Sequence, residues 1–95
     1  MYNLSESIIN EISAIACRYD VEKIVLFGSR AKGTNSKTSD IDLAVYGGNV
    51  AMFSLDIEEE VRTLLMFDVV DMNRVVSAEL RSEIEKYGVV IYEKI

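Results

Sequence analysis

The sequence predicts a small α/β domain in which helices pack against a mixed sheet of about four strands. Short apolar runs of strand length alternate with amphipathic segments of helical period along the 95 residues. Glycine, asparagine and serine residues separate these segments, as is typical of turns. Hydrophobic residues make up 49% of the chain and charged residues 27%, which favours a folded chain over a disordered one. We therefore expect one domain over residues 1–95.

The chain is expected to begin with a helix over Asn3–Arg18, where apolar residues recur every three or four positions. Either Asn3 or Ser5 would cap its start, and Glu6 would complete a capping box with Asn3. The single cysteine, Cys17, is expected to be a small residue of the core.

The remaining elements are predicted from the same two periodicities and from turn residues. They give the order α-β-β-α-β-α-β, with a loop between the first two strands. Their expected bounds are a strand over Glu22–Phe27, a strand over Ile41–Tyr46, a helix over Phe53–Leu65, a strand over Phe67–Met72, a helix capped by Ser77 and running to Tyr87, and a strand over Val89–Tyr92.

Two aspartates at the start of the second strand carry the strongest chemical signal. Side chains alternate between the faces of a strand, so Asp40 and Asp42 share one face while Ile41 takes the other. Two carboxylates roughly 5 Å apart repel each other by on the order of 3 kcal/mol at an effective dielectric constant of about 20. A divalent cation between them would remove that cost, and oxygen ligands suit Mg²⁺ or Mn²⁺.

The loop before these aspartates has the character of a phosphate-binding loop. Gly28 allows a sharp turn and a close approach of backbone to ligand, and the N–H groups of Ser29 and Arg30 begin a helical turn that would face an anion. Arg30, Lys32 and Lys37 make the loop cationic, and it contains no acid before Asp40. Arg30 would hold a phosphate or pair with an acid such as Asp68. A cationic loop beside an acidic metal site suits a nucleoside triphosphate with magnesium.

A third carboxylate is expected from the strand over Phe67–Met72. Asp68 and Asp71 are three residues apart and so point to opposite faces of a regular strand. Only one of them can join Asp40 and Asp42, and the spacing alone does not choose between them.

The composition excludes several kinds of chemistry and partner. The chain has no histidine, which removes Ser-His and Cys-His catalysis and histidine-bound zinc, and its single cysteine excludes an internal disulfide. The net charge of −6 argues against general nucleic-acid binding and favours a basic protein partner. No apolar run is long enough for a membrane span and no signal peptide is evident, so a cytoplasmic location is expected.

The string Gly28-Ser29, ten intervening residues and Asp40-Ile41-Asp42 resembles the signature of the polymerase-beta-like nucleotidyltransferase superfamily. The fuller string from Gly28 to Gly33, followed by Ser39-Asp40-Ile41-Asp42-Leu43, is most similar to its minimal branch, the MNT nucleotidyltransferases. Many of these proteins act as antitoxins beside HEPN-domain toxins. The resemblance extends over almost the whole chain and implies the polymerase-beta-like nucleotidyltransferase fold.

The resemblance also implies a site and a reaction. Asp40, Asp42 and Asp68 would be catalytic and would hold two Mg²⁺ or Mn²⁺ ions, which favours Asp68 over Asp71 as the third carboxylate. Gly28, Ser29 and Arg30 would bind ATP. The expected activity is transfer of AMP to a hydroxyl group of a protein partner, a HEPN toxin. The alternatives are a non-catalytic antitoxin that masks its partner in a stoichiometric complex and, less favoured, a nucleotidyltransferase acting on a small molecule.

Overall fold

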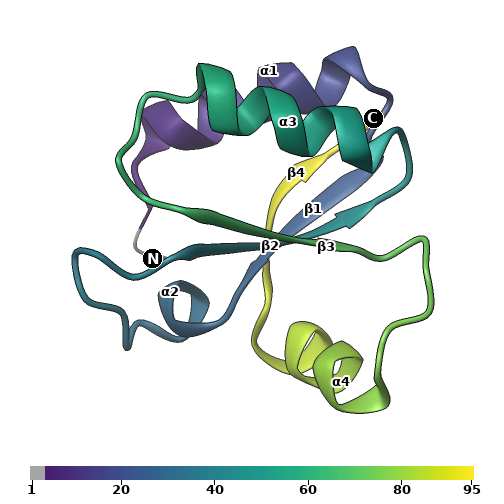
Figure 1. The fold of residues 1–95 in the computed structure, drawn as a ribbon. Helices are drawn as coiled ribbons and strands as arrows, with labels where there is room; N and C mark the ends of the chain where they lie inside the picture. Colours follow the sequence, from purple (N-terminus) through teal and green to yellow (C-terminus); the bar gives the residue numbers. More distant parts are fainter. Residues whose placement is uncertain (1–3) are drawn as a thin grey trace.

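The computed structural model describes residues 4–95 as a four-stranded sheet with helices on both faces (Figure 1). The elements along the chain are α1 (Glu6–Arg18), β1 (Lys23–Phe27), α2 (Ser29–Lys32), β2 (Ile41–Tyr46), α3 (Val50–Glu60), β3 (Phe67–Asp71), α4 (Ala78–Tyr87) and β4 (Val89–Glu93). The predicted fold class and order are confirmed, with the expected helical turn after Gly28 present as the short helix α2.

The sheet has the strand order β3-β2-β1-β4. Strand β1 is antiparallel to both β2 and β4, whereas β2 and β3 are parallel. The sheet is therefore mixed, as predicted. The parallel pair requires a crossover, which α3 provides over one face of the sheet (Figure 1).

The larger core lies between the sheet and the layer formed by α1 and α3. Alternate residues of β1 and β2 point into it, among them Leu26 and Leu43, and Phe53 of α3 meets them with no exposed surface. Burial of side chains of this size stabilises the fold by about 1.5–3 kcal/mol each.

A smaller core lies on the opposite face, beneath α4. Val25, Phe27 and Ala44 of the sheet pack there against Ile84 of α4 and Met72. The face of the sheet that α4 covers therefore also carries the residues two positions from Ala44 along β2, and Asp42 is one of them.

Serine side chains cap the starts of α1 and α4, and a glycine follows the end of α4, as the sequence indicated. The Ser5 hydroxyl accepts the N–H of Ile8 at 3.3 Å and caps α1, while Asn3 lies outside the described residues. The Ser77 hydroxyl accepts the N–H of Leu80 at 3.2 Å and caps α4. Gly88 follows the last residue of α4, and its N–H donates to the carbonyl of Ile84.

The predicted bounds of the middle helix are wrong at both ends. The helix starts at Val50 because the Asn49 side chain accepts the N–H of Met52 at 3.2 Å and acts as a cap. It stops at Glu60, where Val61 turns to extended backbone (φ −73°, ψ 127°). Two features explain the early end: a β-branched valine, and a run of acids at a helix C-terminus, where the dipole disfavours negative charge.

The expectation for Cys17 is also wrong, because this residue is exposed. Ala16 and Ile15 take the buried positions of the same helical turn. No helix within residues 4–95 is long and apolar enough to cross a membrane.

Candidate active site

Asp42 lies near the start of β2 with a strand on either side. Its Cα is in register with Phe27, the last residue of β1, and with Asp68 of the parallel strand β3. Residues in register on adjacent strands project to the same face of a sheet. Asp42 and Asp68 therefore lie side by side on the face that α4 covers in part.

The surroundings of Asp42 disfavour its negative charge. Burial is the largest cause, followed by the charges of Asp68 and Asp40, and together with Glu83 they raise the pKa of Asp42 from 3.8 to about 6. The positive charge of Arg30 acts in the opposite direction. The three aspartates singled out from the sequence are thus within electrostatic reach of one another.

Gly28 lies directly against the Asp42 carboxylate. Its backbone has φ 73° and ψ −154°, a conformation that is essentially restricted to glycine. A Cβ at this position would collide with Oδ2 of Asp42. The missing side chain therefore leaves room for the carboxylate at the point where β1 ends and α2 begins.

Arg30 has a structural contact that the sequence did not predict. Its side chain is only 5% exposed, and its guanidinium donates to the carbonyl of Ser39 from Nε at 3.1 Å and from Nη2 at 2.9 Å. Nη2 also donates to the carbonyl of Lys37 at 3.4 Å. Arg30 therefore fixes the end of the loop immediately before Asp40. Its expected role in binding phosphate stays a prediction.

The structure separates the two candidates for the third carboxylate. Asp68 is exposed and in register with Asp42, whereas Asp71 is at the other end of β3, in register with Val45. Asp71 Oδ1 accepts the N–H of Asn73 at 2.9 Å, and Oδ2 pairs with Arg74 at 3.3 Å. Asp71 thus stabilises the turn after β3, and Asp68 has the better position for joining Asp42.

Asp40 differs from Asp42 and Asp68 in that it does not lie on a strand. It is exposed and precedes β2, so the loop and not the sheet determines its position. Within residues 4–95, no three Asp, Glu or Cys side chains already form a group that could hold a metal ion.

The donor set nevertheless fits a hard divalent cation. Asp42 and Asp68 supply carboxylate oxygens on one face, and Gly28 leaves space beside one of them. The negative charges of Asp68 and Asp40, which act on Asp42 after burial in raising its pKa, would attract a cation to this place.

Glu83 is a residue of this site that the sequence did not reveal. It lies on α4, and its charge is one of the causes of the raised pKa of Asp42. Nothing in its local sequence distinguishes it from Glu79 or Glu85 of the same helix. Only the packing of α4 against β1 brings it near Asp42.

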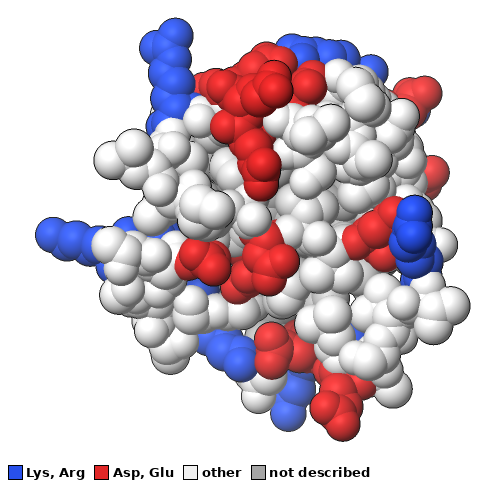
Figure 2. Space-filling model, viewed as in Figure 1, with Lys and Arg blue, Asp and Glu red and all other residues white. Residues whose placement is uncertain are grey.

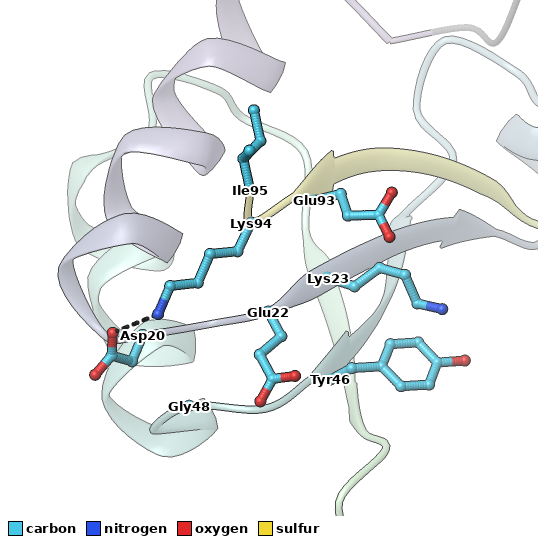
Figure 3. A pocket seen from close by; sticks show the side chains of 8 residues that line it. All are labelled: Asp20, Glu22, Lys23, Tyr46, Gly48, Glu93, Lys94 and Ile95. Carbon is cyan, nitrogen blue, oxygen red and sulfur yellow. Dashed lines mark hydrogen bonds and ion pairs between the residues drawn. The ribbon is translucent and has the colours of Figure 1, made fainter.

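The charged surface does not by itself mark the site. Figure 2 shows acidic side chains over α3 and, on the same side of the molecule, over the middle of the sheet. A hollow of about 710 Å³ lies at the opposite end of β1 and β2, where Lys23 and Tyr46 are in register (Figure 3). Asp20 and Lys94 form an ion pair at 3.0 Å along its wall. This hollow includes none of the predicted site residues.

Comparison with known proteins identifies the family. The family model described as polymerase beta, nucleotidyltransferase, matches residues 10–95. The chain therefore belongs to this nucleotidyltransferase family, and the assignment made from the sequence motifs is confirmed. None of the curated proteins matches the chain.

Solved structures share the fold at low identity. A toxin–antitoxin crystal structure with AMP-PNP has a TM-score of 0.71 and 24% identity, covering 90% of this chain and 73% of that one. A variant of the toxin–antitoxin pair MntA–HpeT has a TM-score of 0.69 and 25% identity, covering 97% and 75%. A minimal nucleotidyltransferase has a TM-score of 0.65 and 23% identity, covering 85% and 86%. The fold is thus that of minimal nucleotidyltransferases.

Replacing Gly28 by alanine is expected to destabilise the fold more than the same change at Gly33. Both glycines have positive φ, but a Cβ at Gly33 would meet nothing within 4 Å. Gly33→Ala should therefore cost only the left-handed backbone, about 1–2 kcal/mol. Gly28→Ala should cost roughly 1–3 kcal/mol more, from the glycine-only conformation and the collision with Asp42.

Urea unfolding of the two variants measures this difference. In the Asp42→Ala background the extra cost of Gly28→Ala should shrink, because the Cβ of residue 42 would then remain at an ordinary 3.4 Å. Equal costs at both glycines would contradict the close contact with the carboxylate.

Asp42→Asn should make the metal-free protein more stable at neutral pH. Folding raises the pKa of Asp42, so the folded state binds its proton more tightly than the unfolded state. The resulting stability is fully present below pH 3.8 and is lost as the pH rises through about 6. After allowance for solvent screening, the loss is about 1–2 kcal/mol.

Thermal melts with EDTA test this expectation. At neutral pH the melting temperature of Asp42→Asn should exceed that of the wild type by about 5 °C, and the difference should vanish in acid. Asp71→Asn is the matched control and should be destabilising, because it weakens the contact to the N–H of Asn73. A destabilised Asp42→Asn protein would mean that this carboxylate is a structural hydrogen-bond acceptor.

Proposed function

We propose that this protein is a metal-dependent nucleotidyltransferase that transfers AMP from ATP to a hydroxyl group of a protein partner, a HEPN-type toxin, and thereby acts as its antitoxin. The observation that carries the proposal is the pairing of Asp42 with Asp68 beside the Gly28 turn. Membership of the nucleotidyltransferase family supports the transfer reaction.

In this proposal, Asp40, Asp42 and Asp68 hold two Mg²⁺ or Mn²⁺ ions. When bound, such ions neutralise the triphosphate and lower the pKa of the attacking hydroxyl group. Asp42 is fixed in the sheet, and the contacts of Arg30 with the carbonyl of Ser39 hold the backbone before Asp40, so the exposed side chain of Asp40 would turn toward the ions. Burial is the largest cause of the raised pKa of Asp42, but the charges of Asp68 and Asp40 also contribute, and a bound cation would relieve that repulsion.

The triphosphate would lie at the start of α2. Gly28 and Ser29 would offer their backbone N–H groups and the serine hydroxyl, and the guanidinium of Arg30 would add positive charge. The hydroxyl oxygen of the acceptor attacks the α-phosphorus, and the bond to the bridging oxygen breaks. Pyrophosphate leaves with that electron pair, and the proton of the hydroxyl passes to the carboxylate of Asp68.

Two observations support a protein as the acceptor. The net charge of −6 suits a basic protein partner. The similar solved structures include toxin–antitoxin pairs, one of them with AMP-PNP.

Mn²⁺ or Mg²⁺ should raise the melting temperature of the wild-type protein, because a ligand that binds the folded state stabilises it by mass action. The increase should disappear in Asp42→Asn and fall sharply in Asp68→Asn. It should persist in Asp71→Asn, which removes the same charge three residues further along the same strand. Loss of the metal effect in Asp71→Asn but not in Asp68→Asn would reverse the assignment of the third carboxylate.

The transfer reaction is tested with ATP labelled at the α-phosphate, Mg²⁺ and the proposed toxin partner. Label should appear on a hydroxyl side chain of the toxin with wild-type protein and with Asp71→Asn. Asp42→Asn should reduce the rate at least 100-fold, as loss of a charge-stabilising group in an active site commonly does. Absence of transfer under any divalent metal, with neutralisation of the toxin unaffected by Asp42→Asn, would favour the alternative of stoichiometric masking.

A further inference from the structure

Strand β3 forms one edge of the sheet, and half of its backbone hydrogen-bonding groups point outward. The N–H of Ile41 donates to the carbonyl of Met66 at 2.8 Å, and the N–H of Met72 donates to the carbonyl of Val45 at 2.9 Å. These contacts turn the backbone groups of the even-numbered residues toward β2. The odd-numbered residues, with Val69 at their centre, therefore direct their N–H and carbonyl groups away from the sheet, where no strand of residues 4–95 pairs with them.

The two edges of the sheet differ in their protection against further pairing. Along β4 the register against β1 shifts between Ile24 and Val25, and bulges of this kind turn an edge strand away from new partners. Strand β3 pairs with β2 in an unbroken register and contains no lysine or proline, the residues that commonly block an edge. It runs along the edge of the sheet between α3 and α4 (Figure 1). A further strand can therefore join the sheet at β3.

A groove of about 310 Å³ opens beside the start of β3, on the face that α3 covers. Its lining is mostly apolar and includes Leu64, Met66 and Phe67. Leu64 is fully exposed and Met66 is 66% exposed, which is unusual for side chains of this kind. Glu58 of α3 also lines the groove and gives it a negative charge. The groove therefore suits an apolar side chain from a segment that also carries basic residues.

The outer edge of β3 lies next to the candidate active site. Asp68 is in register with Asp42, and both side chains project to the same face. A residue paired with Asp68 on an added strand would lie about 5 Å further along the sheet and would project to that face as well. The next residue of the added strand would project to the opposite face, where the groove lies. Two consecutive residues of an extended segment would thus reach the acids and the groove.

We propose that an extended segment of a protein partner pairs with the outer edge of β3 as a fifth strand and presents a hydroxyl side chain beside Asp68. The inference rests on the proposed function, since it states how the acceptor hydroxyl group reaches the site. The segment has an apolar residue next to the hydroxyl residue and basic residues around them, which complement Glu58 and Asp68. Main-chain hydrogen bonds supply the affinity of such pairing, and the groove and the charges supply its selectivity.

Amide hydrogen exchange of the protein, alone and with the proposed toxin partner, tests the pairing. In the protein alone, the N–H of Val70 should exchange slowly because it faces β2, and that of Val69 should exchange fast. The partner should slow exchange at Val69 at least tenfold and change Val70 much less. Slow exchange at Val69 without the partner, and slower still at higher protein concentration, would identify a second copy of this chain as the occupant and overturn the proposal.

Val69→Pro removes the outward N–H and no hydrogen bond to β2. At low partner concentration the rate of transfer should fall at least tenfold, while the increase in melting temperature caused by Mn²⁺ should persist. Val69→Thr is the matched control, because it keeps the N–H and a β-branched side chain, and its rate should stay within twofold of the wild type. Circular dichroism melts establish that each variant is folded, and the exchange measurement on the wild type decides the matter if Val69→Pro is not.

Met66→Ser tests the groove. The KM for the partner should rise about fivefold, whereas kcat and the KM for ATP should stay the same, because the groove binds the acceptor and not the nucleotide. Val90→Ser, at a 49% exposed position on the opposite edge strand, is the matched control and should leave all three values unchanged.

The outcomes separate this inference from the proposed function. Transfer to the partner without added protection at Val69, and with Val69→Pro and Met66→Ser as active as the wild type, would overturn the inference and leave the function standing. Protection at Val69 in a complex that shows no transfer would leave the pairing standing and overturn the transfer reaction. Absence of both complex formation and transfer with any divalent metal would overturn both.

Discussion

The pairing of β2 with a strand on either side is the constraint on which the candidate site depends. Antiparallel pairing with β1 brings Asp42 to the end of that strand, next to the Gly28 turn, and parallel pairing with β3 brings Asp68 to the other side. A shift of one residue in either register would turn one of these side chains to the wrong face. The apolar partners on β2, Ile41 and Leu43, are fully buried against α1 and α3 and hold that register.

The two cores flanking the sheet and the contacts of Arg30 with the loop hold the backbone around the candidate site. Asp42 lies on a strand that is buried on one face and half covered on the other, so only its side chain can adjust. Asp40 lies on a loop whose end is held by the guanidinium of Arg30. Both acids therefore stand on a supported backbone, which is what a site needs in order to hold its ligands in a defined geometry.

Much of the fold could be predicted from the sequence because its signals are local. The alternation Ile41-Asp42-Leu43 defines a strand and its two faces without knowledge of the neighbouring strands. Ser77 marks the start of α4 because its hydroxyl accepts the N–H of Leu80, only three residues further along the chain. The motif from Gly28 to Asp42 likewise lies within one loop and its flanking strands. The family assignment followed from it and is confirmed.

The features that the sequence did not reveal depend on contacts between distant segments. The spacing of Asp68 and Asp71 left the choice between them open and only the family resemblance favoured Asp68, because the register of β3 against β2 cannot be read from the spacing. The proximity of Glu83 to Asp42 requires the packing of α4. The early end of α3 has a local cause at Val61, where the backbone becomes extended. The prediction extended the helix too far because the acidic run and the apolar Leu64 continue the helical spacing beyond that residue.

The space shared by Gly28 and Asp42 links two positions that are fourteen residues apart in the chain. A side chain at position 28 and a carboxylate at position 42 exclude each other, since both would occupy the same volume. The residues that either position can accept therefore depend on the residue at the other position. The backbone at position 28 strains any other residue, and the acid at position 42 adds a collision to that strain, so a non-glycine residue at this turn is least unfavourable in a chain that has also lost the acid.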